Sequence, residues 1–199
     1  MTRRLSILAV VAVIMIAFAG CKAISGLANF AKCNFDYNSV SDVTLCNIAV
    51  GNKTSLKDFS LQDALKIGNA FATKSFPLAL NVNVDVHNPN TSVARLDGFE
   101  YILWIDDMKM TAGSMTKKIL LNANEKTVMP LTFAIDLYEI FSQKGKEKLV
   151  TTACGLAGND KAKSRVKLSL KPYLSVGNSV LRYPGYITIG GNRLMPSGN

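Results

Sequence analysis

The sequence predicts a mostly β protein in which antiparallel strands form a sandwich with one or two added helices. Several segments alternate apolar and polar residues with a period of two, and turns rather than helices separate most of them. No strand-helix-strand rhythm recurs along the chain. The 199 residues, 48% of them hydrophobic, suffice for one domain with a sizeable core and are too few for two ordinary domains.

The first recognisable segment is apolar. Two arginines precede a nearly uninterrupted apolar run over residues 5–18, and small residues follow it. This order is typical of a secretory signal, and the run is shorter than the ~20 residues that a membrane-spanning helix needs. We therefore predict a signal peptide over residues 1–20 in preference to a permanent transmembrane helix.

Phe18-Ala19-Gly20-Cys21 resembles the lipobox of bacterial lipoproteins, with Phe18 in place of the usual leucine. The resemblance implies cleavage before Cys21, a diacylglycerol on its sulfur and stable attachment to the membrane by two or more acyl chains. The alternative is an ordinary signal peptide followed by a chance cysteine. No aspartate follows Cys21 and no acidic run is present, so we expect the periplasmic face of the outer membrane in the bacterial cell envelope.

We expect residues 21–59 to form a linker or N-terminal extension, residues 60–189 a sandwich domain, and residues 190–199 a flexible tail. A helix is predicted over residues 60–73, because Ser60 and Asp63 make a capping-box-like start. An apolar stripe follows at helical spacing, and we expect it to pack on a sheet. The stripe consists of Leu61, Ala64, Leu65, Gly68, Phe71 and Ala72.

Alternation of apolar and polar residues predicts a strand over residues 76–87, and Asn88-Pro89-Asn90 ends it as a turn. A second strand is expected over about 99–106. The further strands expected are 108–111, 119–121, 127–135, 165–174 and 183–189, with helical segments over 136–141 and 148–156. The strand at 127–135 is placed at a sheet edge, because Pro130 has no amide hydrogen to donate.

This order of segments resembles a known family. The residues that carry the resemblance are Pro77-Leu78, Asn88-Pro89-Asn90, Leu96, Phe99-Glu100-Tyr101, Leu103 and Met108 to Gly113. They are similar to the late embryogenesis abundant type-2 family, which includes the water-stress and hypersensitive-response domain, over roughly residues 76–170. The resemblance implies an antiparallel immunoglobulin/fibronectin-III-like sandwich, a link to desiccation in plants, lipoprotein relatives in bacteria and no agreed catalytic residues.

His87 is the one histidine of the chain, which excludes multi-histidine metal sites. The chain has no nucleophile-elbow motif and no phosphate-binding glycine loop. Asp106-Asp107 is typical of a solvated turn. We therefore predict a protein that is not an enzyme, with no catalytic residue, metal or cofactor; a hydrolase that uses His87 is the less favoured alternative.

Cys33 and Cys46 are separated by twelve residues, and in an exported protein either a disulfide or two buried thiols would fit this spacing. Cys154 falls in a predicted helix among small apolar residues and is expected to be a buried, small hydrophobic side chain. Ile102 and Trp104 lie opposite the expected core face of their strand. They line a groove, meet the other sheet or lie beneath a helix, for which the helix of residues 60–73 is the candidate.

The formal net charge of +9 is unevenly distributed. Residues 161–199 hold seven basic side chains and no acidic one, while the preceding part of the mature chain is nearly neutral, so nucleic acid is not an expected partner. Lys163, Arg165, Lys167 and Lys171 share one side of a predicted strand. They form either a solvated outer face or a stripe that binds anionic lipid headgroups or an envelope protein.

From these features we expect a lipid-anchored, non-catalytic sandwich domain of the cell envelope, attached to the membrane through Cys21, with a binding or stress-protective role. The alternative is a subunit of a larger envelope assembly. The sequence does not predict an oligomeric state.

Overall fold

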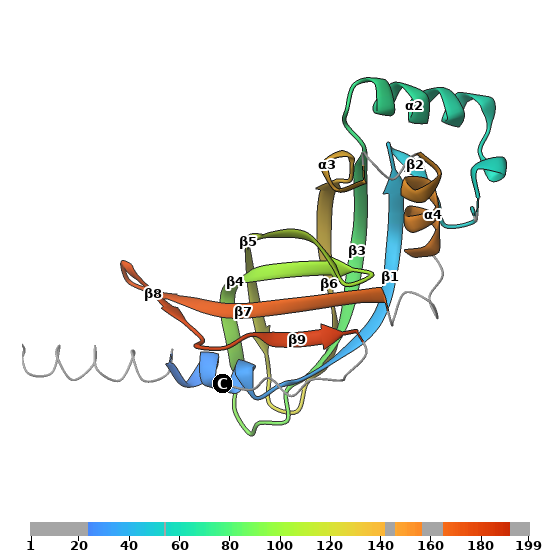
Figure 1. The fold of residues 1–199 in the computed structure, drawn as a ribbon. Coiled ribbons are helices and arrows are strands. Elements are labelled where there is room, and N and C mark those ends of the chain that lie inside the picture. Colours follow the sequence, from blue (N-terminus) through green and yellow to red (C-terminus); the bar gives the residue numbers. More distant parts are fainter. Residues whose placement is uncertain (1–23, 54, 142–145, 157–164, 192–199) are drawn as a thin grey trace, which may run out of the picture.

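The computed structural model describes residues 24–53, 55–141, 146–156 and 165–191. These residues form two antiparallel sheets packed face to face, with helices at the ends (Figure 1). The predicted β-sandwich with added helices is thereby confirmed. The predicted signal peptide, Cys21 and residues 192–199 of the predicted tail lie outside the described residues. No helix of the described ranges has the length and apolarity needed to span a bilayer.

The first sheet has the strand order β2-β1-β3-β6. Its strands are β1 (Asn34–Leu45), β2 (Ile48–Ala49), β3 (Pro77–His87) and β6 (Lys126–Asp136). In β3 every second side chain from Leu78 to Val86 is buried, as the alternation predicts. β6 is an edge strand of this sheet, as predicted from Pro130. An edge strand pairs on one side only, so a residue without an amide hydrogen is tolerated there.

The second sheet has the order β5-β4-β7-β8, and β9 also pairs with β7. Its strands are β4 (Ala94–Ile105), β5 (Met108–Leu121), β7 (Val166–Val176), β8 (Ser179–Arg182) and β9 (Ile187–Gly190). The two short strands predicted at 108–111 and 119–121 are one continuous strand, because the polar middle of β5 lies at a sheet edge. The strand predicted at 183–189 is interrupted, because Pro184-Gly185 turns the chain between β8 and β9.

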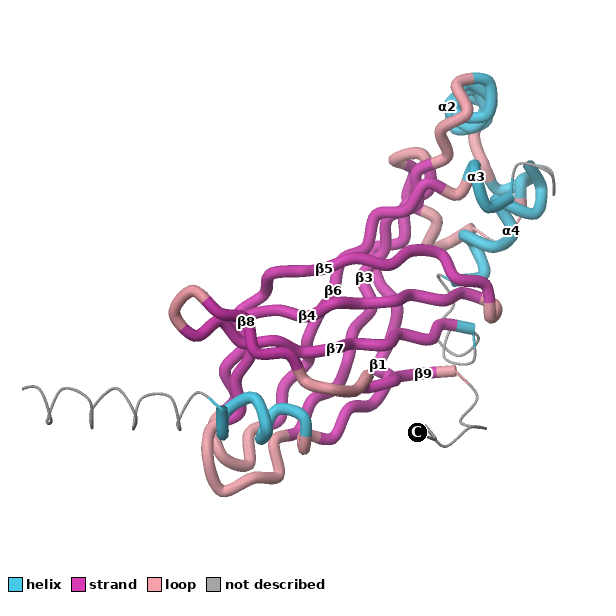
Figure 2. Tube along the Cα trace, turned by 60° about the vertical axis from the view of Figure 1, so that its left-hand side comes forward, coloured by secondary structure: helices cyan, strands magenta, loops and turns pink. Residues whose placement is uncertain are grey.

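The core lies between the two sheets, whose strands run across one another (Figures 1 and 2). Tyr101 of β4 and Phe133 of β6 meet across it edge to face, with ring centroids 5.1 Å apart. Each large side chain buried here stabilises the fold by about 1.5–3 kcal/mol relative to an exposed one. The largest fully buried side chains are Phe30, Phe76, Phe99, Phe133, Leu45, Leu78, Leu80, Leu96, Leu103, Ile105 and Leu121.

The prediction that residues 21–59 form a linker or extension is wrong for β1, which lies within the first sheet between β2 and β3. The register of β1 against β3 shifts between Tyr37 and Ser39 and again between Ser41 and Thr44. Each irregularity changes which residues face the core, so no continuous period of two is visible in the sequence. A helix over residues 24–31 precedes β1 and buries Leu27 at one end of the sandwich.

The predicted turn at Asn88-Pro89-Asn90 is confirmed, and it joins three parts of the chain. The fully buried Asn88 amide donates to the main-chain oxygens of Ser92, Leu121 and Asn122 at 2.7–3.2 Å. The Asn90 amide donates to the main-chain oxygen of Asn29 at 3.0 Å. The turn therefore links the end of β5 and the helix over residues 24–31 to the β3–β4 connection.

The other helices gather at the opposite end of the first sheet from residues 24–31 (Figures 1 and 2). They are a short 3-10 helix (Leu56–Asp58), α2 (Leu61–Ala72), α3 (Tyr138–Phe141) and α4 (Lys146–Leu156). The capping box predicted for α2 is confirmed, since the Asp63 amide donates to Ser60 Oγ at 3.1 Å and the Ser60 amide to the Asp63 carboxylate at 3.3 Å.

Candidate functional site

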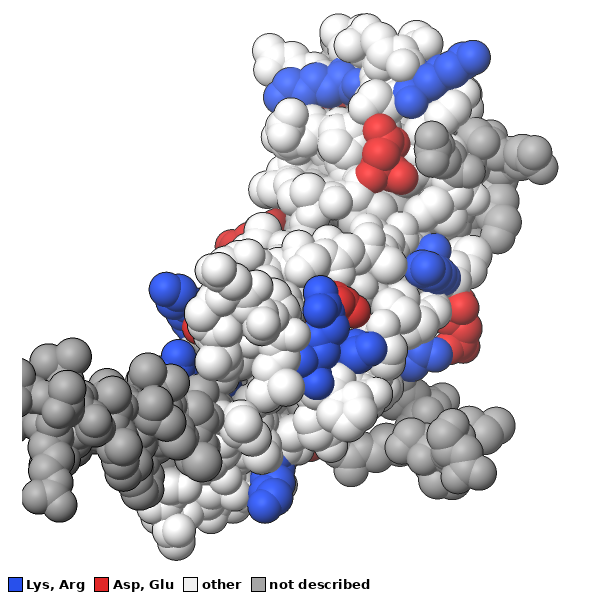
Figure 3. Space-filling model, turned by 90° about the vertical axis from the view of Figure 1, so that its left-hand side faces the viewer, with Lys and Arg blue, Asp and Glu red and all other residues white. Residues whose placement is uncertain are grey.

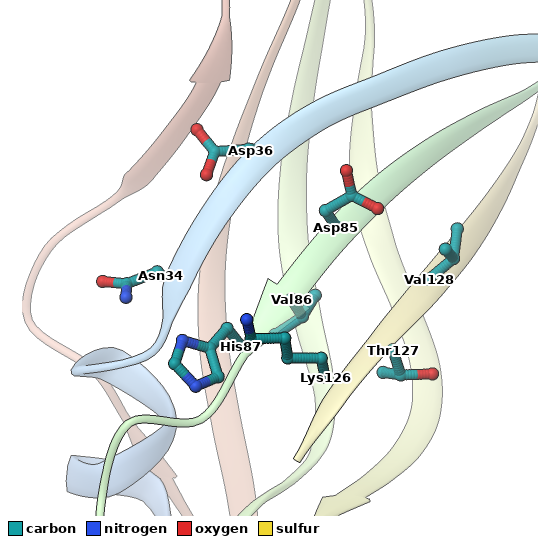
Figure 4. A pocket seen from close by; sticks show the side chains of 8 residues that line it. All are labelled: Asn34, Asp36, Asp85, Val86, His87, Lys126, Thr127 and Val128. Atoms are coloured by element: carbon teal, nitrogen blue, oxygen red, sulfur yellow. The ribbon is translucent and has the colours of Figure 1, made fainter. Parts of the chain in front are cut away.

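An open groove of about 470 Å³ lies on the outer face of the first sheet, at the end where β3 stops (Figure 4). Because side chains alternate along a strand, every second residue of β1, β3 and β6 points to this face. The groove is lined by Asn34, Asp36, Asp85, Val86, His87, Lys126, Thr127 and Val128. Most of these residues are polar, so the groove suits a hydrophilic ligand.

Two rows of cross-strand neighbours arrange the charges in the groove. His87 is in register with Asn34 on one side and Lys126 on the other, whereas Asp85 is in register with Asp36. Figure 4 shows the two carboxylates at one end and His87 with Lys126 at the other. Residues two apart on a strand are about 6.6–6.8 Å apart. The acidic row and the row with His87 and Lys126 are therefore close enough for one small zwitterionic ligand to contact both.

A hydrogen-bonded network continues from the groove along the same face. The Asn38 amide donates to Asp85 at 2.9 Å, and the Asn83 amide donates to Ser39 at 2.9 Å and to Ser41 at 3.2 Å. Further along, the Asn81 amide donates to Asp42 at 2.7 Å. These bonds hold short polar side chains in fixed orientations, so the face presents an ordered hydrophilic surface.

His87 has no hydrogen bond to a serine, threonine or cysteine among the residues that the structure describes. Within those ranges, no three side chains of the histidine, cysteine, aspartate or glutamate type gather as a metal site would require. The groove thus lacks the nucleophile-to-base contact by which a catalytic histidine is recognised. The non-catalytic character of the protein stays a prediction.

The disulfide considered for Cys33 and Cys46 is not formed, and both residues are buried free thiols. They lie at opposite ends of the twelve-residue β1, which places them on the order of 40 Å apart. A disulfide needs Cα atoms within about 7 Å. Burial raises the pKa of both thiols to about 11, with the nearby charge of Asp136 adding to the effect at Cys46. Cys154 is also a buried free thiol, as predicted.

The basic residues of β7, and Arg165 just before it, lie next to acids and aromatic rings. Arg165 donates to both carboxylate oxygens of Asp106, at 2.7 and 2.8 Å. Lys167 Nζ lies 3.8 Å from an Asp107 oxygen and 4.8 Å from the centroid of the Trp104 ring. Figure 3 shows the blue side chains of this face in separate groups, several with red neighbours, and not as one continuous surface.

Lys171 Nζ lies 5.7 Å from the centroid of the Tyr186 ring, and Lys171 is in register with Glu100 on β4. Glu100 in turn accepts from Arg182 at 2.8 Å. The fourth predicted member of the stripe, Lys163, lies outside the described residues. Whether the stripe binds an anionic surface stays a prediction, and Asp106-Asp107 forms an ion-paired turn within it.

The structure shows what surrounds Trp104 and Ile102. α2 lies beyond the end of the first sheet and away from β4, the strand that holds Trp104 (Figures 1 and 2). Trp104 is half-buried on the outer face of the second sheet, with Lys167 over its ring. Ile102 lies two residues away on the same face.

The expected packing of the apolar stripe of α2 on a sheet is wrong. Ile67 and Ala70, on another side of the helix, are buried, while the side chains of Leu61 and Leu65 are 80% and 67% exposed. The helix lies past the end of the strands, so no sheet lies beneath its leucines. Phe71 of the stripe packs on another element, with its ring centroid 5.8 Å from that of Tyr138, whereas the two leucines remain on the exposed side of the helix.

Sequence reasoning singled out His87 but missed the residues that line the groove with it, among them Asn34, Asp36 and Lys126. Asn34 and Asp36 belong to β1, whose strand character the bulges conceal. The alternation of Phe35 and Tyr37, both buried, is the one local signal that could have revealed this end of β1.

No protein-family model matches the chain, and no curated protein matches it either. Three solved structures show distant similarity. A protein from Archaeoglobus fulgidus has a TM-score of 0.35 and 11% identity, with 79% of this chain and 99% of that chain covered. A protein described as late embryogenesis abundant has a TM-score of 0.32 and 14% identity, with 93% of this chain and 87% of that chain covered.

The third structure is a β-glucosidase from Erythrobacter marinus, with a TM-score of 0.23, 14% identity, 79% of this chain covered and 15% of that chain. One of the three neighbours thus shares its description with the family that the sequence resembles. At these TM-scores the neighbours carry no argument about function, and membership of the late embryogenesis abundant type-2 family stays a prediction.

Proposed function

We propose that this protein is a lipid-anchored, non-catalytic binding domain of the bacterial cell envelope. The observation that carries the proposal is the place of Phe18-Ala19-Gly20-Cys21 in the chain. Two residues separate Cys21 from the helix over residues 24–31, and Leu27 of that helix is buried in the core of the sandwich. A lipid on Cys21 would therefore hold a folded domain at the membrane without a spacer.

The proposed binding surface is the groove at His87 and the ordered polar face that continues from it. Asp36 and Asp85 suit an amine, and Lys126 with His87 suits a carboxylate or phosphate. A ligand with both charges and several hydroxyl or amide groups matches this arrangement, and envelope glycopeptides have that chemistry. Because the polar face beside the groove holds its side chains in fixed orientations, we propose ligand binding, and not stress protection, as the role to test first.

The lipid anchor is tested by the mass of the mature N-terminus. The full chain is expressed in a Gram-negative host, and the membrane fraction is digested and analysed by mass spectrometry. We expect the mature chain to begin at Cys21 with acyl groups attached, and we expect Cys21→Ser to abolish the modification. Cys154→Ala is the matched control, since it removes a buried thiol and leaves Cys21 in place. An unmodified Cys21 in the wild-type protein would refute the anchor.

The binding surface is tested by titrating the isotopically labelled protein with soluble peptidoglycan fragments. We expect backbone resonances near His87 and Asp85 to shift. We expect the double variant Asp85→Asn with Lys126→Gln to bind the fragments at least about tenfold more weakly, a loss of roughly 1.4 kcal/mol of binding free energy. Lys57→Gln, an exposed lysine at the opposite end of the molecule, is the control. Shifts confined to other surfaces would exclude the groove.

The second candidate function is a subunit of a larger envelope assembly, and the exposed leucines of α2 favour it. The partner this face would fit is an amphipathic helix of another envelope protein, because Leu61, Leu65, Gly68 and Ala72 follow the 4-3-4 spacing of a helix-pairing seam. A stoichiometric partner that co-purifies with the wild-type protein, and is lost on Leu65→Glu in a variant with unchanged folding, would support this candidate. Retention of the partner by that variant would exclude α2 as the contact.

A further inference from the structure

We infer that the sandwich rests directly on the bilayer through an apolar surface on the side where the chain leaves towards Cys21. This inference rests on the proposed lipidation of Cys21. Six of the ten large hydrophobic side chains exposed among the described residues belong to this surface, which we name the anchor-side patch. Its members are Ile24, Val93, Leu120, Val176, Val180 and Leu181.

Contacts between the elements hold the patch together. The Arg95 side chain lies against Gly26 of the helix over residues 24–31, so closely that a Cβ there would come within 2.5 Å of Arg95 Cγ. Leu120 of β5 is in register with Arg95. The Arg95 guanidinium lies 4.0 Å from an Asp97 oxygen, and the other Asp97 oxygen accepts from the Ser175 amide at 2.8 Å. One continuous set of contacts thus joins the helix, β4, β5 and the β7–β8 hairpin.

The tip of the β7–β8 hairpin projects beyond the strand beside it. The pairing of β4 with β7 ends at Gly98 and Tyr173, whereas β7 continues to Val176 and every residue of β8 is exposed. Leu181 is in register with Leu174, and therefore shares a side of the hairpin with Val176. Val180 is in register with Ser175 and lies on the other side. Exposed apolar side chains thus lie on both sides of the hairpin, beside its turn at Gly177-Asn178-Ser179, and they suit contact with a lipid surface.

The length of chain before residue 24 brings this patch to the membrane. Ile24 lies three positions after Cys21, and even a fully extended chain spans at most about 11 Å over that stretch. The polar layer on each side of a bilayer is only about 5–8 Å thick. A lipid on Cys21 would therefore keep Ile24 at the headgroup layer, with no room for the domain to stand away from the surface.

The orientation of the fold agrees with this placement. Figures 1 and 2 both show the hairpin tip and the beginning of the helix over residues 24–31 on the same side of the sandwich, and α2 at the far end. Arg95 and Arg182 border the patch with half-exposed side chains. Each is paired with an acid, Arg95 with Asp97 at 4.0 Å and Arg182 with Glu100 at 2.8 Å, so this border carries no excess negative charge that anionic headgroups would repel. The occupant we assign to the patch is therefore the bilayer that carries the anchor.

The test uses the lipidated full chain with a single added cysteine. The native described thiols are buried, so Val180→Cys can be labelled selectively with an environment-sensitive fluorophore. The protein is reconstituted in vesicles of phosphatidylethanolamine and phosphatidylglycerol. We expect a blue shift of emission, quenching by nitroxide-labelled acyl chains and protection from iodide in water. Leu65→Cys, an exposed position on α2, is the matched control and is expected to stay accessible to iodide.

Each outcome is decisive. If the protein is lipidated but the label at residue 180 stays in water, contact between the anchor-side patch and the bilayer is refuted, and the proposed lipid anchor still stands. Protection from iodide without quenching by the lipid nitroxides would mean that protein, and not lipid, covers residue 180. That result would also refute contact between the anchor-side patch and the bilayer. A mature chain without lipid on Cys21, seen in the mass spectrum of the same sample, overturns both proposals.

Discussion

Asn88 shows at the scale of one residue how a turn residue can also hold distant segments together. Its side chain is fully buried, and its amide hydrogens are shared among three main-chain oxygens, one in the β3–β4 connection and two at the end of β5 and just after it. The sequence motif predicts the turn, because proline and asparagine favour one. It does not reveal the buried bonds, because two of the three acceptors lie more than 30 residues away in the chain.

We expect Asn88→Ala to lower the free energy of unfolding by about 2–4 kcal/mol, because it leaves buried main-chain oxygens without donors. Urea denaturation followed by circular dichroism measures the change. Asn69→Ala, at an exposed asparagine in α2, serves as the control and is expected to leave stability unchanged or slightly raised. A loss below about 0.5 kcal/mol for Asn88→Ala, the range of ordinary surface changes, would mean that water replaces the amide there.

The buried thiols permit a second prediction at this scale. With pKa values near 11, Cys33 and Cys46 are about 0.1% ionised at pH 8, and both are shielded from solvent. In the Cys21→Ser chain we expect no reaction with an aromatic disulfide reagent until the protein is unfolded. Reducing agent is expected to leave the melting temperature unchanged, and a fall in that temperature would reveal a disulfide that stabilises the fold.

At the scale of elements, the predictability of each strand depended on the regularity of its pattern. β3 pairs with β6 without a register shift and alternates along its length, so its bounds were predicted to within a residue. β1 is one residue longer than β3 and also buries side chains in the core, but two irregularities break its period, and Asp42 adopts a φ of 52°. Bulges are a property of strand pairing, which a single segment of sequence does not display.

The two sides of α2 should respond differently to truncation. Ile67→Ala removes a buried side chain and should lower the free energy of unfolding by about 2–4 kcal/mol. Leu65→Ala removes an exposed one and should change it by less than about 0.5 kcal/mol. Thermal or urea denaturation of both variants tests this contrast. Equal losses would show that another part of the chain covers the leucines in solution.

The junction of β6 and α3 predicts an acid-sensitive contribution to stability. Burial alone would raise the pKa of Asp136, but the amides of Phe76 and Tyr138 and the Ser75 hydroxyl donate to its carboxylate at 2.8–2.9 Å and lower that pKa below its usual 3.8. The unfolded chain then takes up the proton more readily than the folded one. The stabilisation is therefore present above about pH 4 and is lost as the pH falls through the lower, folded-state value.

We expect Asp136→Asn to lower the free energy of unfolding at pH 7 by about 1 kcal/mol, a small value because solvent screens this exposed carboxylate. The loss should shrink as the pH falls from 5 to 2, where the wild-type carboxylate is itself being protonated. Asp107→Asn, at a carboxylate that is 97% exposed, is the control and should be silent over this range. A loss for Asp136→Asn that stayed constant down to pH 2 would contradict the assignment.

At the scale of the whole molecule, the candidate site was harder to predict than the fold. The sandwich follows from local patterns, since alternation and turns are visible segment by segment. The groove needs His87 and Lys126, 39 positions apart, beside Asn34, more than 50 positions away. That convergence depends on the order of strands in the sheet, and the sequence carries no local trace of it. The same holds for the anchor-side patch, which four separate segments build.

The fold shows that acidic residues lie beside much of the positive charge in the C-terminal part of the chain. The basic surplus of the last 39 residues is real, but β4 and the β4–β5 turn bring Glu100, Asp106 and Asp107 beside it. Four described cations of the second sheet (Arg165, Lys167, Lys171 and Arg182) thus face three acids. The local surplus is about one charge, and one exposed lysine near an anionic membrane contributes only about 1 kcal/mol.

We therefore expect neutralisation of this stripe to have a small effect on membrane binding. In the Cys21→Ser chain, which lacks the lipid site, Lys167→Gln with Lys171→Gln should reduce association with phosphatidylglycerol vesicles less than about tenfold at low salt, because the removed charges are already matched. Sedimentation of the vesicles at low and high salt measures it. Val180→Asp in the same background tests the anchor-side patch and should reduce association more, since it places a charge where acyl chains are expected. If the lysine variant has the larger effect, the paired stripe and not the patch is the surface that meets the membrane.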